Sequence, residues 1–414
     1  MLSLESARQW LTALPLRKGL NPLSIAPNFE DYILTMMTHG DYDDYWKQLD
    51  INWAEYYDRT ADIPMIHVSG WYDSYCGGTI QNYLGLSRRL KSPVHLLIGP
   101  WTHGGNTRSY AGEVEFGAQA GLSDFHREFH LRWFDRFLKG EKTREEPPVR
   151  IFVMGTGDGH KDENGRLYHG GYWREESEWP PAGTRLVPYY FHADGTLRTE
   201  SPQGNGAPTT YRFDPEHPVP TIGGAFSSTS PIFEPGAFDQ RERADIFGAS
   251  PPYLPLKARS DVVIFQTELL EEAVEIVGPI VVRLYASSTA VDTDFTAKLI
   301  DVYPPSPDFP AGFEMNLTDG ILRARYRESP ERQVLMKPGA VYELTIEPFP
   351  TGNVFKRDHR IRIDISSSNF PRFDVNPNTG EPLGKERRWV AADNSIYHDA
   401  ARPSRVVLPL VPPR

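Results

Sequence analysis

The chain has 414 residues, of which 39% are hydrophobic and 24% are charged, and its formal net charge is −11. This composition is typical of soluble globular proteins, and the length predicts two domains or three. The negative charge disfavours nucleic-acid binding, because neutralising phosphates requires clustered Lys and Arg. The single cysteine, Cys76, excludes an internal disulfide and a cysteine-based zinc site.

The hydropathy of the chain disfavours a membrane protein. No stretch approaches the about 18 uninterrupted apolar residues that a membrane-spanning helix needs. The opening residues, MLSLESARQW, lack the charged leader and apolar core of a secretory signal peptide. We therefore expect a cytoplasmic protein. Its aromatic content of 12% and its 37 prolines predict many turns and a large β component.

The first half of the chain has the pattern of an α/β protein. Residues 1–60 are predicted to be mostly helical and irregular, because NFEDYILTMMTHG and DYDDYWKQLD space apolar residues at roughly helical intervals. A strand is predicted over 63–70, a helix over 77–90 and a second strand over 94–100. Two apolar strands joined by one helix predict a βαβ unit with a parallel sheet.

A strongly amphipathic helix is predicted over 121–139. Its aromatic residues recur at every fourth position: Phe125, Phe129, Trp133 and Phe137. Gly140 is expected to end the helix. The segment PPVRIFVMG over 147–155 is predicted to add one more strand to the sheet.

The second half of the chain has a different pattern, with short alternating runs separated by Gly, Pro, Asp and Asn. Examples are VVIFQTELL, DFTAKLIDVYP and HRIRIDISSSNF. Short strands spaced by turn signals favour an antiparallel sandwich or jelly roll. We place a domain boundary within 156–185 and expect three segments, 1–60, 61–170 and 171–414.

Two loops carry residues suited to acid–base chemistry, and each follows a predicted parallel strand. The first loop, GWYD, contains Asp73, and the second, GPWTH, contains His103. Sites gather at the carboxyl ends of strands in open α/β sheets, so the two side chains are expected to meet. A carboxylate that orients a histidine base is one half of a Ser-His-Asp triad, and α/β-hydrolases have the order Ser, Asp, His. The alternative is an ordinary helix N-cap and a packed loop histidine.

The nucleophile of such a triad is not found. It should precede Asp73 in a G-x-S-x-G turn between a strand and a helix, and no serine upstream lies in that pattern: Ser3, Ser6, Ser24 and Ser69. Cys76 is the other candidate nucleophile near the two loops, and its alternative is a buried, inert thiol.

Two groups of residues suggest metal sites only weakly. Three acidic residues on a strand pattern lack the loop of an EF-hand and are interpreted as strand-end carboxylates: Asp292, Asp294 and Asp301. His126 and His130 are four positions apart on the predicted helix but lack an H-E-x-x-H motif, so we interpret them as residues of a helix face. We therefore expect no metal and no cofactor.

Several segments together resemble the bacterial cocaine-esterase and X-Pro dipeptidyl-peptidase hydrolases. They extend over nearly the whole chain: HVSGWYDSY, LLIGPWTHGG, HREFHLRWFDRFLKGE, VRIFVMG, FDPEHPVPTIGG, SSTAVDTDFTAKLIDVYP, DGILRARYRES and GNVFKRDHRIRIDISSSNFPRFDVNPNTG. The resemblance implies a partial α/β-hydrolase domain over 61–170, preceded over 1–60 by the remnant of a helical cap. An all-β jelly roll over 171–414 follows.

The resemblance also implies roles for individual residues. Asp73 matches the family's triad aspartate and His103 its histidine, whereas the serine and the tyrosine oxyanion donor lie in sequence that this chain does not contain. The aromatic two residues after the aspartate, Tyr75, and the apolar residue after the Gly-Gly turn of the jelly roll, Phe226, are implied to face the substrate.

Three interpretations of the chain stay open at this point. It is an incomplete serine hydrolase of esters or X-Pro peptide amides, or a subunit of a split hydrolase that a separate N-terminal chain completes. The third interpretation is a non-catalytic jelly-roll binding module. The expected partners are a small ester or peptide substrate and either an N-terminal half or a second copy across the open edge of the sheet, since unpaired strand edges promote association.

Overall fold

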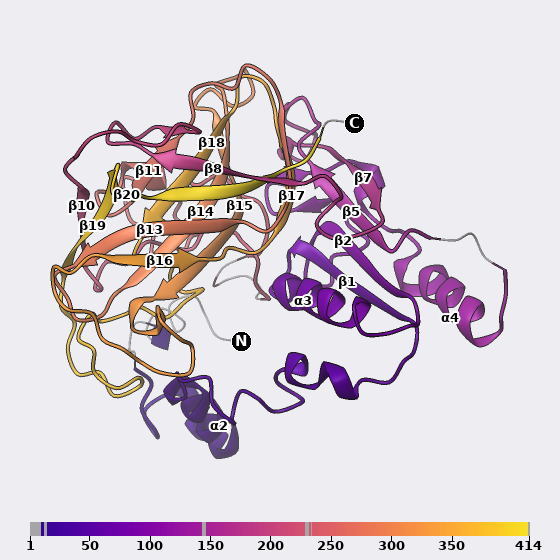
Figure 1. Ribbon diagram of the computed structural model, residues 1–414, viewed down its shortest axis with the longest axis horizontal. Coiled ribbons are helices and arrows are strands. Elements are labelled where there is room, and N and C mark those ends of the chain that lie inside the picture. The colour runs from indigo at the N-terminus through magenta and orange to yellow at the C-terminus, as the bar shows by residue number, and fades with distance from the viewer. Residues whose placement is uncertain (1–9, 12–14, 143–145, 228–231, 233, 413–414) are drawn as a thin grey trace.

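The computed structural model describes residues 10–11, 15–142, 146–227, 232 and 234–412. Figure 1 shows a mixed α/β part beside a larger antiparallel β domain. Within the described residues, none of the helices has the length and apolar character that crossing a membrane requires. The α/β part comprises α2 (Pro27–Thr38), β1 (Met65–Tyr72), α3 (Cys76–Ser87), β2 (Val94–Thr102), β3 (Tyr110–Ala111), β4 (Val114–Glu115), α4 (His130–Leu138), β5 (Val149–Met154), β6 (Leu167–Tyr168) and β7 (Gly171–Glu176).

The strands β1, β2 and β5 lie side by side and parallel. Met65 pairs with Val94, and Leu96 pairs with Val149. Nearly all residues of β2 and β5 are buried, as expected for strands whose two faces are both covered. The predicted strands, the predicted helix and the parallel pairing are therefore confirmed. Among the described residues β1 has one strand neighbour, β2, so its other edge is unpaired.

Residues 15–60 form helix α2 and two 3-10 turns, Pro22–Ile25 and Trp53–Arg59. Pro27 begins α2, where its fixed φ suits the first helical turn. The helix lies below the loops of the β domain in Figure 1 and apart from α3. The segment after α2 is bonded to the β domain, since the Tyr42 amide donates to the Pro330 carbonyl. Part of the helical and irregular prediction, residues 1–9 and 12–14, lies outside the described residues.

The helix predicted over 121–139 is only partly correct. A π-helical turn spans Phe125–Phe129, and regular α-helix begins at His130. The Phe129 amide donates to the Asp124 carbonyl, five residues back, which is the hydrogen bond of a π turn. The turn stacks Phe125 on Phe129 beside Trp101, with 5.2 Å between the two phenyl centroids. Trp101, Phe125 and Phe129 thus belong to one small aromatic cluster beside the π turn.

The second half folds as two antiparallel sheets, as predicted. One sheet runs in the order β11-β18-β14-β15, and the other continues from β5 through β17, β12, β21, β13 and β19 to β10. The strands of this domain are β8 (Arg185–Phe191), β9 (Leu197–Arg198), β10 (Thr209–Phe213), β11 (Val263–Gln266), β12 (Val274–Gly278), β13 (Val281–Ser288), β14 (Asp294–Tyr303), β15 (Phe313–Arg323), β16 (Tyr342–Ile346), β17 (Thr351–Phe355), β18 (Arg360–Ser366), β19 (Ala392–Asp399), β20 (Arg402–Pro403) and β21 (Arg405–Leu410).

The α/β part and the β domain share a continuous interior. A single hydrophobic cluster extends from the α/β strands into the β domain, and Asn353 of β17 pairs with Met154 of β5. Buried polar groups also cross this junction, because the His169 ring bonds to the Tyr303 hydroxyl and, at 2.8 Å, to the Asn353 amide oxygen. Burial lowers the pKa of His169 to about 4. The boundaries at residues 60 and 170 stay predictions.

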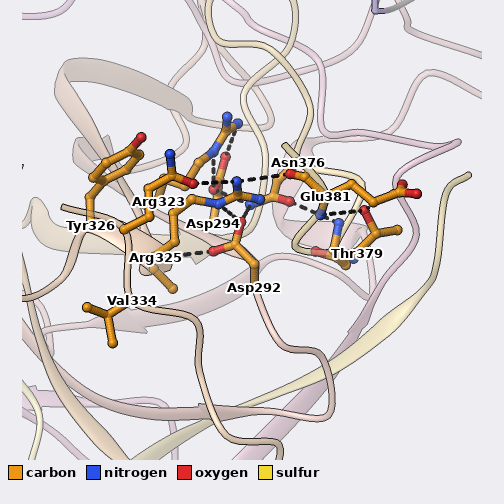
Figure 2. Close-up of polar contacts among 12 residues, drawn as sticks. Asp292, Asp294, Arg323, Arg325, Tyr326, Val334, Asn376, Thr379 and Glu381 are labelled. Carbon is orange, nitrogen blue, oxygen red and sulfur yellow. Dashed lines mark hydrogen bonds and ion pairs between the residues drawn. The ribbon is translucent and has the colours of Figure 1, made fainter. Parts of the chain in front are cut away.

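Buried ion pairs fix one end of the β domain. The Arg325 guanidinium donates to Asp292 at 2.7 Å, with both side chains at most 1% exposed, and Arg323 donates to Asp294 at 3.0 Å. Figure 2 shows Asn376 between the two aspartates, donating to one oxygen of each. Asp301, the third acidic residue of the strand pattern, accepts a hydrogen bond from His359 when Nδ1 of that ring carries the proton. All three acidic residues thus serve as hydrogen-bond acceptors.

Replacing Arg325 by Met is expected to destabilise the protein by about 3–5 kcal/mol, because Asp292 would stay buried without its partner. Urea unfolding followed by tryptophan fluorescence measures the change. The control, Arg198→Met, removes an exposed pair with Asp194 (side chains 46% and 53% exposed) and should cost less than about 1 kcal/mol. Equal costs for the two variants would contradict this view of the buried pair.

Candidate active site

Asp73 follows β1 directly, and the end of that strand is firmly anchored. Trp71 is 1% exposed, and its indole N–H donates to the Phe152 carbonyl of β5 at 2.7 Å. Gly70 permits the close approach of β2, because a Cβ atom there would lie 2.1 Å from the Trp101 carbonyl oxygen. The register of the two strands shifts just after this glycine, so the chain turns toward the loop with Asp73 at its start.

His103 follows β2 in the same manner. Trp101, two positions earlier, is 1% exposed, and its indole N–H donates to the Ala120 carbonyl at 2.8 Å. Each candidate residue therefore comes two positions after a buried tryptophan whose ring nitrogen is bonded to backbone. These anchors restrict both strand ends, which lie at the same edge of the parallel sheet.

The structure brings the two candidate residues together. The Nδ1 atom of His103 lies 3.2 Å from Oδ2 of Asp73. The other carboxylate oxygen, Oδ1, accepts the Tyr75 amide at 2.9 Å, so Asp73 both shapes the start of α3 and orients the imidazole. An ionised carboxylate only accepts hydrogen bonds, so neutral His103 carries its proton on Nδ1 and leaves Nε2 bare.

The two sides of this pair differ in exposure. The Asp73 side chain is 10% exposed, whereas that of His103 is 55% exposed. Tyr75 is 60% exposed and lies over the histidine, with 5.2 Å between the ring centroids. The carboxylate is thus largely shielded from water, whereas more than half of the imidazole side chain is exposed.

The β domain contacts both sides of the Asp73 loop. The Tyr72 hydroxyl donates to the Asn316 carbonyl of β15 at 3.0 Å, and the Ser74 and Ser227 hydroxyls are 2.6 Å apart. Phe226 is 6% exposed and precedes Ser227 in the chain, so its turn adjoins the site. A substrate-facing role for Phe226 stays a prediction.

The described residues contain no nucleophile bonded to His103. Ser69 is 3% exposed on β1, and Ser3 and Ser6 lie outside the described residues. Cys76 is fully buried, and burial, with the nearby charge of Asp73 as a smaller cause, raises the pKa of its thiol far above the usual range. The cysteine alternative is therefore disfavoured, because the thiolate is the reactive form.

Some features of the site have no simple sequence signal. The G-W-Y-D and G-P-W-T-H motifs indicate the strand ends, but the carbonyl partners of the two tryptophans are remote in sequence.

His126 and His130 are both exposed on the segment that precedes and begins α4. In the part of the chain that the structure describes, no group of three potential metal ligands gathers.

Two protein families match the sequence. Residues 6–105 match the X-Pro dipeptidyl-peptidase (S15) family, and residues 141–407 match the X-Pro dipeptidyl-peptidase C-terminal non-catalytic domain. Cocaine esterase from Rhodococcus sp. (strain MB1 Bresler) is 34% identical over 391 residues, which cover 91% of this chain and 61% of the esterase.

Solved structures give the same result. An aminopeptidase from a marine sediment Thaumarchaeota archaeon superposes with a TM-score of 0.76 at 25% identity, covering 94% of this chain and 61% of that one. An alpha-amino acid ester hydrolase superposes with a TM-score of 0.77, also at 25% identity, covering 94% and 62%. The chain therefore spans about three fifths of the length of these proteins.

The fold and these comparisons define a class first, namely hydrolases in which a mixed α/β part precedes an antiparallel β domain. Within that class, the chain belongs to the CocE/NonD (S15 X-Pro dipeptidyl-peptidase) family of hydrolases.

The thiol of Cys76 is expected to be unreactive in the folded protein, because it is buried and its pKa is raised. Titration with Ellman's reagent at neutral pH should show at least about a hundredfold slower reaction in the native protein than in urea, where one thiol per chain reacts. Rapid stoichiometric reaction of the native protein would restore Cys76 as a candidate nucleophile.

Proposed function

We propose that Asp73 and His103 are the aspartate and the histidine of a Ser-His-Asp triad in a hydrolase of acyl esters or X-Pro peptide amides. The serine of this triad comes from a segment outside these 414 residues, so the chain alone is expected to be inactive. The observation that carries the proposal is the 3.2 Å contact between His103 Nδ1 and Asp73 Oδ2, with Nε2 directed away from the carboxylate.

The reaction follows from this arrangement. His103 Nε2 removes the proton of the serine hydroxyl as the serine oxygen attacks the carbonyl carbon of the substrate. Asp73 stabilises the imidazolium that forms. The tetrahedral intermediate collapses, the bond to the alcohol or amine breaks, and His103 donates its proton to that leaving group. Water then attacks the acyl-enzyme by the same route and releases the acid and the free serine.

The exposure of the site supports an incomplete triad. In an assembled triad the imidazole lies between the carboxylate and the nucleophile, whereas the His103 side chain here is 55% exposed and Tyr75 is 60% exposed. The unpaired edge of β1 lies beside the same strand end. We propose that the nucleophile-bearing segment adds a parallel strand at this edge and covers the two rings.

The substrate class rests on the relatives. An esterase, an aminopeptidase and an amino acid ester hydrolase all match the chain, and each name describes cleavage next to an acyl or aminoacyl group. The chemistry is the same whether the nucleophile segment belongs to the same polypeptide or to a separate one. A second copy of the chain at the β1 edge supplies no nucleophile elbow, so we favour a different segment there.

A non-catalytic binding function is the second candidate. The match over 141–407 is to a domain described as non-catalytic, and it covers the β domain. This function requires neither Asp73 nor His103. The contact between these two residues in triad geometry therefore favours the hydrolase.

The chain alone should not react with a fluorophosphonate serine probe, because no serine is activated. Co-expression with an upstream segment that contains a G-x-S-x-G turn should restore labelling and hydrolysis of p-nitrophenyl acetate. In that complex, His103→Ala should lower kcat by about 10⁴-fold or more.

The matched control is His126→Ala, which removes an exposed histidine outside the site and should leave kcat unchanged within about twofold. Strong labelling of the chain alone would contradict the missing nucleophile. Activity that survives His103→Ala in the complex would reject His103 as the base.

A further inference from the structure

A cavity of about 460 Å³ lies between α2 and the β domain. Its wall comes from four parts of the chain: Pro15, the end of α2, the paired ends of β14 and β15 with Tyr326, and residues 373–389. The volume is in the range of sites for small organic ligands. None of the lining residues belongs to the Asp73–His103 pair or to the loops that carry it.

One side of the cavity is apolar and aromatic. Met36 and Met37 of α2 line the cavity together with Phe373 and Trp389. Methionine side chains adapt to ligands of different shape, and an indole ring attracts a cation over its face. These residues provide a site for the body of a ligand with an aromatic or branched apolar group.

The polar side of the cavity carries an excess of negative charge. Arg323 donates to both oxygens of Asp294 at 3.0 Å, so these two charges cancel. Figure 2 shows the Asp292–Arg325 pair next to them, which is neutral in the same way. The carboxylates of Asp374 and Glu386 line the same cavity and remain in excess.

The two excess carboxylates differ in their partners. Asp374 is 60% exposed and shares Arg323 with Asp294 at 3.2 Å. Glu386 forms no ion pair with the described residues, although its neighbours in sequence, Arg387 and Arg388, are basic. Burial is the main cause that raises the pKa of Glu386; the nearby charge of Asp374 acts in the same direction, and the charges of Arg323 and Arg325 act against it.

We propose that this cavity binds a small organic cation, an ammonium group joined to an aromatic or branched apolar body. The ammonium lies between Asp374 and Glu386, and the body packs against Trp389. An anion is disfavoured because it would have to displace a carboxylate from Arg323. A neutral ligand is disfavoured because it would remove water from the Glu386 carboxylate without supplying a positive charge in its place. The proposal goes beyond hydrolysis and does not depend on the triad.

The test is isothermal titration calorimetry of this chain with benzyltrimethylammonium. The matched probes are phenylacetate, which is an anion, and benzyl alcohol, which is neutral. The cation should bind at one site per chain and at least about tenfold more tightly than either matched probe. Raising the salt concentration from about 0.05 M to about 0.5 M should weaken cation binding, since the carboxylates are partly exposed.

Variants locate the site. Glu386→Gln and Asp374→Asn should each weaken binding of the cation by about fivefold or more, and both should keep the Arg323–Asp294 pair. The control is Glu268→Gln, which removes the same charge from a residue that is 81% exposed and forms an ion pair with Arg360. It should leave the affinity for the cation unchanged. If Asp374→Asn shifts the thermal unfolding midpoint, the variant also changes stability, and the affinity of Glu386→Gln alone then tests the proposal.

Three results would overturn the proposal. These are the absence of measurable binding of benzyltrimethylammonium at millimolar concentration, tighter binding of phenylacetate, and equal affinities of the Glu386→Gln variant and the unchanged chain. Loss of cation binding in Glu386→Gln with retention in Glu268→Gln supports it.

Discussion

The hydrogen bond between Asp73 and His103 depends on how two parallel strands end. Both residues follow strands that are fixed by a buried indole, Trp71 in β1 and Trp101 in β2, and each indole N–H is satisfied by a backbone carbonyl. Gly70 permits the close approach that brings the ends together. The carboxylate is shielded, and each of its oxygens has a hydrogen-bond partner. It therefore holds the imidazole in the tautomer with the proton on Nδ1, which leaves Nε2 free to accept a proton.

The β domain stabilises this arrangement directly. The hydroxyl of Tyr72, one residue before Asp73, donates to the backbone of β15, and Ser74, one residue after it, is bonded to the turn that carries Phe226. The same core cluster extends through both parts of the protein. A domain that the family description calls non-catalytic thus contacts the proposed catalytic loop on both sides of Asp73.

Much of the α/β part was predictable from local pattern, because apolar strands and turn glycines leave clear periods in the sequence. The pattern predicts the ends of the two strands, and functional sites in open α/β sheets lie at the carboxyl ends of parallel strands. Together they predict that Asp73 and His103 meet. The π turn at Phe125–Phe129 was not predictable, because the apolar period of the sequence fits a regular helix and carries no signal for the hydrogen bond from Phe129 to Asp124. Charge pairs such as Asp292–Arg325 and the cavity beside α2 join segments far apart in sequence, and one sequence carries no local signal for such contacts.

The central claim concerns one proton on one imidazole. Nitrogen-15 NMR of the chain at about pH 9, where histidine is neutral, reports the tautomer, and the His103→Gln variant assigns the resonance. The account predicts a proton on Nδ1 of His103 and a shift toward the Nε2–H form when Asp73 is replaced by Ala. An Nε2–H tautomer in the unchanged chain, or a spectrum that Asp73→Ala leaves unaltered, would contradict it.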